Sequence, residues 1–349
     1  MLTIIIPTHE RHHVLARAID FYQDFNFNIV IADSSAKKLD IELPDNITYR
    51  HYPDLNYVKK ILKTAESITT PYICLTADDD YLLESSLCEG LSFLKSNLDF
   101  VSVQGIYLQF ELIENEVIFS PKYGSQEASY AVEGEDSLSR VVRAYNPYMH
   151  QFYSIQHKDI FIKSFRSCAH FSVCHFAELA TILVPMCYGK HRVLPILWMA
   201  RDTYVFYRPD VYQNPGPEKS KHGVISHWYR MSDYLIGEIK SFLASEESRV
   251  MKKEFAKNIS DLVSSEKESD ELFNAAFKSY IKGKKRHRDK ILIKLILKIF
   301  IPNWVLKKYK KRERIQHTGA IETSSPAKEA LEKIRMSIEK FSDIYNQKV

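Results

Sequence analysis

The feature that most constrains the fold is an ordered alternation of short apolar runs and helical patterns in the first hundred residues. The predicted strands are Leu2–Ile6, Asn28–Ala32, Ile47–Tyr52 and Tyr72–Thr76. Between them, apolar residues recur at helical spacing over Val14–Phe25 and Val58–Ile68. This order predicts a parallel sheet with helices on its faces, and the ligands of such sheets bind at the carboxyl ends of the strands.

Acidic residues follow two of the predicted strands. Asp33 follows the second strand, and Asp78, Asp79 and Asp80 follow the fourth. Three consecutive carboxylates repel one another and raise one another's pKa, and a bound cation removes this electrostatic repulsion. Alternate residues of an extended segment point the same way, so Asp78 and Asp80 can converge on one ligand. Carboxylate oxygens favour Mg²⁺ or Mn²⁺, and the alternative is a solvated acidic turn that caps the next helix.

Beyond residue 100 the pattern becomes mixed and then purely helical. Further predicted strands are Phe100–Gln104, Tyr107–Phe110, Glu116–Ser120 and Val193–Met199, and further predicted helices are Leu138–Tyr145 and Phe176–Cys187. Arg208–Gly223 contains three prolines and two glycines, which predicts a loop. We therefore expect one domain over residues 1–223, with parts 1–105 and 106–223, and a helical region over 224–349.

Three segments resemble family 2 glycosyltransferases of the GT-A fold. LTIIIPTHERHHVLARAIDFY resembles the family's first strand and helix, NIVIADSS its second strand ending in aspartate, and PYICLTADDDYLL its D-x-D strand. The matches cover about a third of the chain. The resemblance implies an α/β fold, a GT-A-like three-layer sandwich with a mostly parallel central sheet, followed by a helical C-terminal region.

The resemblance also implies roles for the residues that match the first two segments. Pro7, Thr8 and Arg11 are expected to line the nucleotide pocket, with Arg11 near the base or the diphosphate. Asp33 is expected to accept hydrogen bonds from the base or the ribose. Considered without the acidic triplet, Arg11 and Asp33 are better explained as an exposed charge at a helix start and a strand-end turn.

For the third segment, the resemblance implies a metal site. Asp78 is expected to contact the ribose or the metal, and Asp80 to bind the Mn²⁺ or Mg²⁺ that bridges the donor diphosphate. Because the triplet is longer than D-x-D, Asp79 can share either role. Family members often supply a histidine from a later loop as another metal ligand, and His222 is the candidate here.

An inverting sugar transfer needs a carboxylate that takes the proton of the acceptor hydroxyl. The family places this base at the start of a helix after the mixed region, and Glu178 is the comparable residue. Stabilisation of the helix dipole is the alternative role for Glu178, and Asp136 and Asp202 remain further candidates for the base. His170 and His175 flank the same helix and either orient Glu178 or belong to the core.

A basic stretch before and within the predicted loop offers contacts to the diphosphate or the acceptor. The residues expected to make them are Arg201, Asp202, Lys219 and Lys221, with Arg208 nearby. A mobile basic loop can close over a diphosphate and exclude water. The alternative is an ordinary solvated loop.

The net charge of +4 is concentrated in one segment. Between Lys284 and Arg314 there are 13 Lys and Arg residues and two acids, interleaved with aliphatic residues from Ile291 to Phe300 and followed by Trp304 and Tyr309. One apolar and one cationic face predict a helix that lies on an anionic membrane surface. A nucleic-acid arm has less use for so many aliphatic residues, so no nucleic-acid partner is expected; a partner-helix groove remains the other alternative.

Cysteines and the N-terminal residues indicate the expected compartment. The five cysteines are odd in number and include no C-x-x-C pair, which favours a reducing environment. The start MLTIIIP lacks the pattern of a signal peptide, and no apolar run has the roughly 18 residues of a membrane-spanning helix. We expect a cytoplasmic protein, peripheral on the inner face of the plasma membrane.

Together these features predict an inverting hexosyl- or N-acetylhexosaminyltransferase. It is expected to move a sugar from a nucleotide-diphosphate donor, foremost a UDP-sugar, to a saccharide or lipid-linked glycan in cell-surface polysaccharide or glycolipid biosynthesis. One alternative is a GT-A-like nucleotidyltransferase, although PTHERHH lacks a glycine-rich phosphate loop. The other is a non-catalytic, membrane-docked protein that binds nucleotides or glycans.

Overall fold

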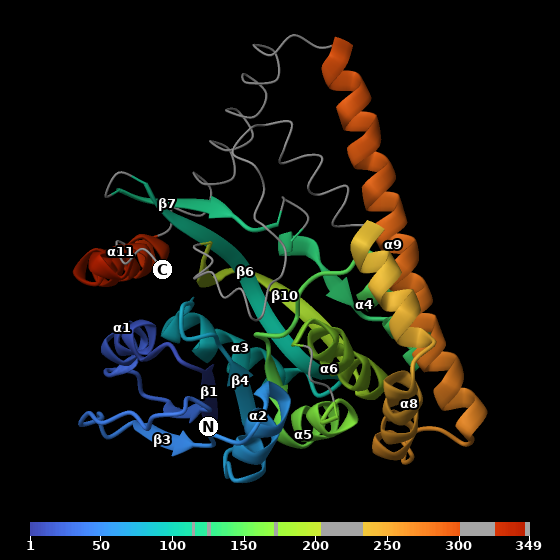
Figure 1. The fold of residues 1–349 in the computed structure, drawn as a ribbon, viewed down its shortest axis with the longest axis horizontal. Helices are drawn as coiled ribbons and strands as arrows, with labels where there is room; N and C mark the ends of the chain where they lie inside the picture. The colour runs from blue at the N-terminus through green and yellow to red at the C-terminus, as the bar shows by residue number, and fades with distance from the viewer. Residues whose placement is uncertain (114–115, 124–126, 171–173, 204–232, 301–324, 346–349) are drawn as a thin grey trace.

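A computed structural model describes residues 1–113, 116–123, 127–170, 174–203, 233–300 and 325–345 of the chain. These residues form a layered α/β structure in which helices cover both faces of a central sheet and further helices follow in the C-terminal part (Figure 1). The predicted fold class, a three-layer α/β sandwich with a helical C-terminal region, is confirmed.

The centre of the molecule is one twisted sheet. Its strands are β1 (Leu2–Thr8), β2 (Asn28–Asp33), β3 (Ile47–His51), β4 (Tyr72–Leu75), β5 (Tyr81–Leu82), β6 (Phe100–Ile113), β7 (Glu116–Pro121), β8 (Ala131–Val132), β9 (Ile155–His157) and β10 (Lys190–Asp202). Their order is β3-β2-β1-β4-β9-β6-β10-β5, with β7 beside β6 and β8 beside β10. The β1–β2, β1–β4, β2–β3 and β6–β10 pairs are parallel and contain most of the paired residues; the remaining pairs are antiparallel.

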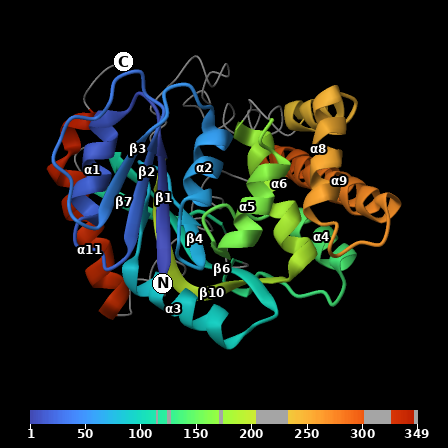
Figure 2. The same cartoon turned by 90° about the horizontal axis from the view of Figure 1, so that it is seen from below.

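Helices pack on both faces of this sheet. They are α1 (His12–Tyr22), α2 (Tyr57–Glu66), α3 (Glu84–Ser96), α4 (Ser137–Tyr145), α5 (Lys158–Ser167), α6 (Cys174–Tyr188), α8 (Glu246–Asn258), α9 (Glu266–Phe300) and α11 (Ser325–Lys340), with a further helical segment at 233–243 and 3₁₀ turns at Glu127–Ser129 and Ser342–Tyr345. Figure 2 shows α1 and α11 on one side of β1, β2 and β3, and α2 and α5 on the other. Among the described residues, no helix is both long enough and apolar enough to cross a bilayer.

The first four predicted strands are present as β1 to β4, and β1 extends past the point where its proline was expected to end it. The carbonyl of Ile5 accepts a hydrogen bond from Thr76 N, so the backbone N–H and C=O groups of odd-numbered β1 residues point toward β4. The N–H that Pro7 lacks would therefore point toward β4, beyond the last paired residue, Leu75. Because no ladder bond is lost there, the strand continues to Thr8.

Two predicted strands, Phe100–Gln104 and Tyr107–Phe110, are a single strand in the structure, β6. Gly105 between them is a close approach to β10 and not a break, because a Cβ at this position would lie 2.5 Å from the carbonyl oxygen of Ile196. The short strands β5, β8 and β9 and the helix α5 were not predicted. Strands of two or three residues carry too little periodicity to be found in a sequence.

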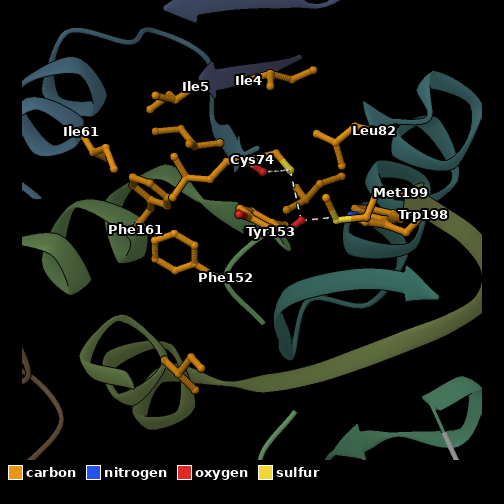
Figure 3. Packing of buried hydrophobic residues seen from close by; sticks show 14 of the residues in the cluster. Ile4, Ile5, Ile61, Cys74, Leu82, Phe152, Tyr153, Phe161, Trp198 and Met199 are labelled. Carbon is orange, nitrogen blue, oxygen red and sulfur yellow. Dashed lines mark hydrogen bonds between the residues drawn. The ribbon is translucent and has the colours of Figure 1, made fainter. Parts of the chain in front are cut away.

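The core connects the sheet to the segment that precedes β9. Figure 3 shows side chains from β1, α2, α5 and β10 packed around Tyr153. The backbone carbonyl of Tyr153 accepts hydrogen bonds from Trp198 Nε1 at 3.0 Å and from Cys74 Sγ at 3.3 Å (Figure 3). Strands β4 and β10 therefore both hold this segment in place. Cys74, Cys88, Cys168 and Cys187 are free thiols.

The C-terminal helices pack against α1, α4, α5 and β7. Helix α9 packs along α4, and Gly283 lets it approach Asn146, whose Oδ1 would lie 3.2 Å from a Cβ. Helix α11 returns to α1 and β7, where Ser337 Oγ and Tyr81 OH are 3.3 Å apart. The predicted domain boundary between residues 223 and 224 lies outside the described residues.

Candidate active site

The acidic triplet lies between β4 and β5, at the carboxyl end of the parallel part of the sheet. It is not a solvated turn, because Asp78 and Asp80 are only 1% and 3% exposed. Thr8, the last residue of β1, donates a hydrogen bond from Oγ1 to Asp78 Oδ2 at 2.6 Å. The Arg11 guanidinium, at the start of α1, bonds to Asp78 and, at 2.9 Å, to Asp79. The structure thus brings these predicted nucleotide-site residues together.

Asp80 is held from the other side of the sheet by the end of β10. Arg201 Nε lies 3.2 Å from Asp80 Oδ2, and the backbone N–H of Asp202 donates to Asp80 Oδ1 at 3.0 Å. Burial raises the pKa of Asp80 to about 7, with Arg201 opposing the shift and Asp79 adding to it. Burial also raises the pKa of Asp78, against the effect of Arg11. Near neutral pH, Asp80 is therefore close to its point of half-protonation.

The chemistry of Asp80 fits a divalent cation. A buried carboxylate whose pKa lies near neutrality, with Asp79 beside it, gains when a cation replaces the proton. In the part of the chain that the structure describes, no group of three or more His, Cys, Asp or Glu is arranged to hold a metal ion. Mg²⁺ and Mn²⁺ sites often use one or two carboxylates and complete their shell with phosphate oxygens and water. The donor set matches a site that a substrate completes.

A buried ion pair between Arg17 and Asp202 packs against the backbone of the triplet. Arg17 of α1 lies with Nη2 3.2 Å from Asp202 Oδ2, and both side chains are 1% exposed. The same Nη2 donates to the backbone carbonyl of Asp79 at 2.9 Å, and the guanidinium stacks 5.1 Å from the ring centroid of Tyr81. The carboxylate of Asp202 therefore binds Arg17, while its backbone N–H binds Asp80.

Asp33 ends β2 next to Thr8 and is saturated with hydrogen bonds. Ser35 donates to Oδ1 from both its backbone N at 2.7 Å and its Oγ at 2.6 Å. Tyr49 OH and His12 Nε2 both lie 2.7 Å from Oδ2. Burial alone would raise the pKa of Asp33, but the bonds from Ser35, Tyr49 and His12 outweigh it and lower the pKa. Asp33 is consequently a fixed anion at neutral pH.

Two further features lie at this edge of the sheet. Lys60 of α2 is buried and directs Nζ to the carbonyl of Thr8 and, at 3.0 Å, to Ser34 Oγ. Beside Tyr49 lies a hollow of about 630 Å³, a size suited to a small organic ligand. Its lining residues are Lys38, Leu39, Asp40, Ile41, Leu43 and Tyr49.

Glu178 lies in the first half of α6 and is 30% exposed. Its Oε2 is 3.7 Å from Nε2 of His150, which is 8% exposed. Burial is the larger cause of the raised pKa of Tyr148 and Tyr280, and the charge of Glu178 adds to both shifts. Tyr280 belongs to α9, and its ring centroid is 5.4 Å from that of Tyr148. The surroundings of Glu178 are aromatic and come from several elements.

Tyr153 lies between the triplet and Glu178. Burial is the main cause of its raised pKa, and among the charges that act on its hydroxyl are Arg201, Asp80 and Glu178. The Arg201 guanidinium stacks 5.0 Å from the centroid of the Tyr153 ring. The ring of Tyr153 in turn lies 5.1 Å from that of His150, which lies beside Glu178, so Arg201, Tyr153 and His150 connect Asp80 to Glu178.

The remaining predicted residues are placed as follows. Asp136 caps α4, accepting from Ser139 N at 2.8 Å, so its carboxylate already has a structural partner. His170 is exposed in the turn after α5. The side chain of His175, together with Arg208, Lys219, Lys221, His222, Trp304 and Tyr309, lies outside the described residues.

Sequence reasoning missed Arg17, Lys60 and His150. Arg17 lies one turn from Val14 and Phe21 on the apolar face of α1, so a charge in a core-facing position was the available signal. Lys60 likewise lies on the buried face of α2, next to Ile61. His150 lies in a segment without periodicity between α4 and β9, and the sequence contains no signal for its role.

Comparison with known proteins finds distant structural similarity. No protein-family model matches the chain, and no curated protein matches it. Similar solved structures include S. aureus TarS 1-349 in complex with UDP-GlcNAc, at 11% identity and a TM-score of 0.44, over 83% of this chain and 92% of that one. Another is the mannosyltransferase PcManGT from Pyrobaculum calidifontis in complex with GDP-Man and Mn²⁺, at 11% identity and a TM-score of 0.43, over 99% of this chain and 88% of that one. At these scores the similarity assigns no role to any residue.

Proposed function

We propose that this protein is an inverting glycosyltransferase that takes a sugar from a nucleotide-diphosphate donor, a UDP-sugar foremost. The observation that carries the proposal is the pair of buried, arginine-bound aspartates at the end of β4, which Arg201, Tyr153 and His150 connect to Glu178. In this proposal, the aspartates hold a cation and their arginines bind the diphosphate. Glu178 is the carboxylate that an acceptor hydroxyl can reach. Transfer of a sugar from a diphosphate to an alcohol requires both.

The donor is expected to lie along the edge formed by β1, β2 and β4. Asp33, held as an anion, is the candidate contact to the base or ribose, with the ligand taking the place of a present donor such as His12 Nε2, and the hollow beside Tyr49 offers space for the base. Thr8 and Arg11 line the path to the diphosphate, and Pro7 shapes the backbone there. Asp78 orients Arg11 and is the candidate contact to the ribose.

The chemistry at the sugar then follows from two residues. The oxygen of the acceptor hydroxyl attacks the anomeric carbon while Glu178 takes its proton. The bond from the anomeric carbon to the diphosphate oxygen breaks, and the electron pair leaves with the nucleoside diphosphate. Arg201, stacked on Tyr153 beside Asp80, is placed to bind the negative charge that develops on this leaving group.

Asp80, with Asp79 beside it, is the group that holds Mn²⁺ or Mg²⁺ in this proposal. The cation supplies neutralisation of the diphosphate charge when it is bound. We retain His222 as the candidate for a further metal ligand, and Lys219 and Lys221 as candidates for contacts to the diphosphate. All three residues lie outside the described residues.

The acceptor side points to a saccharide, on a lipid carrier or on a polymer. The tyrosines around Glu178 offer rings and hydroxyls suited to a sugar. Helix α9 contributes Tyr280 to this region and continues into the basic segment 284–314, with Lys284 stacked 5.1 Å from the Tyr280 ring. We propose that this segment binds an anionic membrane on its cytoplasmic face and thereby brings lipid-linked acceptors to Glu178.

A donor screen tests the function. Thermal stabilisation is measured for the wild type and Asp80→Asn with a panel of nucleotide sugars, with and without Mn²⁺, and hydrolysis of each donor is followed in parallel. We expect metal-dependent stabilisation of the wild type by one class of donor and its loss in Asp80→Asn. Asp99→Asn, at an exposed acid remote from the triplet, is the matched control.

Three results would contradict the proposal. Stabilisation by no donor would exclude a sugar-nucleotide site. Binding without any hydrolysis or transfer would support the non-catalytic binding protein. Release of pyrophosphate from a nucleoside triphosphate would support the nucleotidyltransferase.

A further inference from the structure

His150 is a buried histidine that the proposed chemistry does not yet use. It lies in the segment between α4 and β9 and is 8% exposed, whereas Glu178 beside it is 30% exposed. Its ring packs among three aromatic rings, with centroids 5.1 Å from Tyr153, 5.8 Å from Phe152 and 6.2 Å from Tyr107. The ring therefore has little freedom to turn.

The backbone of His150 is also fixed on both sides. Gln104 Nε2, on β6, donates to the carbonyl of His150 at 2.9 Å. The backbone N–H of His150 bonds to the hydroxyl of Tyr123, at the end of the β6–β7 hairpin. A histidine held this firmly by a strand and a hairpin presents its free edge in one direction, and that edge faces Glu178.

The hydrogen-bonding pattern selects one form of the imidazole. Nε2 lies 3.7 Å from Glu178 Oε2, while Nδ1 is buried without a partner among the described residues. In the neutral tautomer protonated on Nε2, the N–H faces the carboxylate and Nδ1 carries no proton. The imidazolium would place a second N–H, on Nδ1, where it has no acceptor. Burial also lowers the pKa of His150, consistent with a neutral ring.

We propose that His150 is a positioning residue for Glu178, donating from Nε2 to one carboxylate oxygen so that the other faces the acceptor hydroxyl. This inference rests on the proposed function, since it assigns Glu178 as the base. The distance of 3.7 Å is longer than a hydrogen bond, and such contacts in unliganded sites shorten when substrate binds. The ring donates a hydrogen bond to Glu178 but transfers no proton, so it stays in the same neutral form through the reaction.

Several ionisable groups around the pair also act on it. Lys122, after β7, and Arg201, on β10, disfavour a charge on His150. Burial is the main cause of the raised pKa values of four tyrosines from other elements, and the charge of Glu178 adds to the shift in each; they are Tyr123, Tyr148, Tyr153 and Tyr280. Because all are buried phenols with raised pKa values, they stay neutral near neutral pH.

The test compares two substitutions of His150 in the full-length protein. His150→Phe keeps a ring for the aromatic packing and removes the donor; His150→Gln keeps an amide N–H near the position of Nε2. We expect His150→Phe to lower kcat roughly tenfold with an unchanged donor KM, and the acid limb of the pH–rate profile to move up by about one pH unit. We expect His150→Gln to recover most of both changes.

A second buried histidine controls for packing. His191, on β10, bonds through Nδ1 to Ser102 Oγ at 2.8 Å and is fully buried. His191→Phe should reduce thermal stability without changing kcat or the pH profile. The ¹³C resonance of the Glu178 carboxyl, titrated in the wild type and in His150→Phe, gives a second readout, and its midpoint should shift in the same direction as the acid limb.

The outcomes separate the inference from the function it rests on. A wild type that transfers sugar and a folded His150→Phe with the same kcat and pH profile would overturn the positioning role alone. Equal impairment of His150→Phe and His150→Gln would assign His150 to packing and overturn it as well. A wild type that transfers no sugar from any donor would overturn both proposals.

Discussion

The two carboxylate groups of the candidate site are built in opposite ways. On the donor side, Asp33, Asp78 and Asp80 are buried at strand ends, and each is bound by at least two neighbouring groups. In the part proposed to bind the acceptor, Glu178 is a 30% exposed residue of a helix, with His150 Nε2 3.7 Å from its carboxylate. The first arrangement suits a binding surface that is ready before the ligand arrives, and the second suits a group that must exchange a proton.

The largest expected effect is at Glu178. Glu178→Gln keeps the size of the side chain and removes its basicity, so kcat should fall by roughly 10²- to 10⁴-fold while donor affinity is unchanged. Single-turnover rates and donor titration measure the two quantities. Asp159→Asn, an exposed acid in the first turn of the neighbouring α5, is the control. Retained turnover in Glu178→Gln would remove the contrast between the two sides and send the search for the base elsewhere.

The next effect tests how firmly the donor side is built. Arg17→Met keeps apolar packing against Tyr81 but leaves the buried Asp202 carboxylate without its cation, so the free energy of unfolding should drop by about 3–5 kcal/mol. Urea denaturation measures it. Arg249→Ala, in an exposed pair with Glu246, should cost less than about 1 kcal/mol. Equal small losses in both would mean that the buried pair is not a support of the triplet.

The pH dependence of metal binding sharpens the same contrast. With the pKa of Asp80 raised to about 7, protons compete with Mn²⁺ below that pH. Metal affinity, measured by calorimetry with a bound donor, should therefore rise with pH up to about 7 and then level off, with a slope of about tenfold per pH unit below 7. A flat affinity between pH 5 and pH 8 would contradict the assignment of Asp80 as the ligand.

The same raised pKa has the opposite consequence for the ligand-free fold. The folded state holds a proton on Asp80 up to about pH 7, whereas an unfolded aspartate loses it near pH 4. Asp80 therefore makes the free energy of unfolding larger as the pH falls from 7 toward 4, and Asp80→Asn should remove this contribution.

The smallest effect is at Asp33, where several donors share one carboxylate. Tyr49→Phe removes one hydrogen bond to Asp33 Oδ2 and leaves those from Ser35 and His12. The free energy of unfolding should fall by about 1 kcal/mol, and donor affinity by less than tenfold. A loss as large as that of Arg17→Met would show that Tyr49 acts through the hollow beside it as well.

Much of the donor side could be predicted from the sequence. Short apolar strands that end in Asp33 and in the triplet determine which acids meet, because the carboxyl ends of neighbouring parallel strands share one edge. Thr8 and Arg11 lie just after the predicted strand Leu2–Ile6, and Asp78 and Asp79 lie just after the predicted strand Tyr72–Thr76. Their contacts therefore join the ends of two strands that the periodicity of the sequence predicts. The aspartates' partners across the sheet, Arg201 and the N–H of Asp202, depend on β10.

The acceptor side was decided by the tertiary structure. His150 lies in the segment that Trp198 and Cys74 hold at the Tyr153 carbonyl, and it meets Glu178 of α6, while Tyr280 comes from α9 to stack on Tyr148. Local periodicity shows which face of a helix or strand is buried, and it therefore predicts the strands and the acidic residues at their ends. It contains no information on which distant surfaces meet, because that depends on how all the elements pack together.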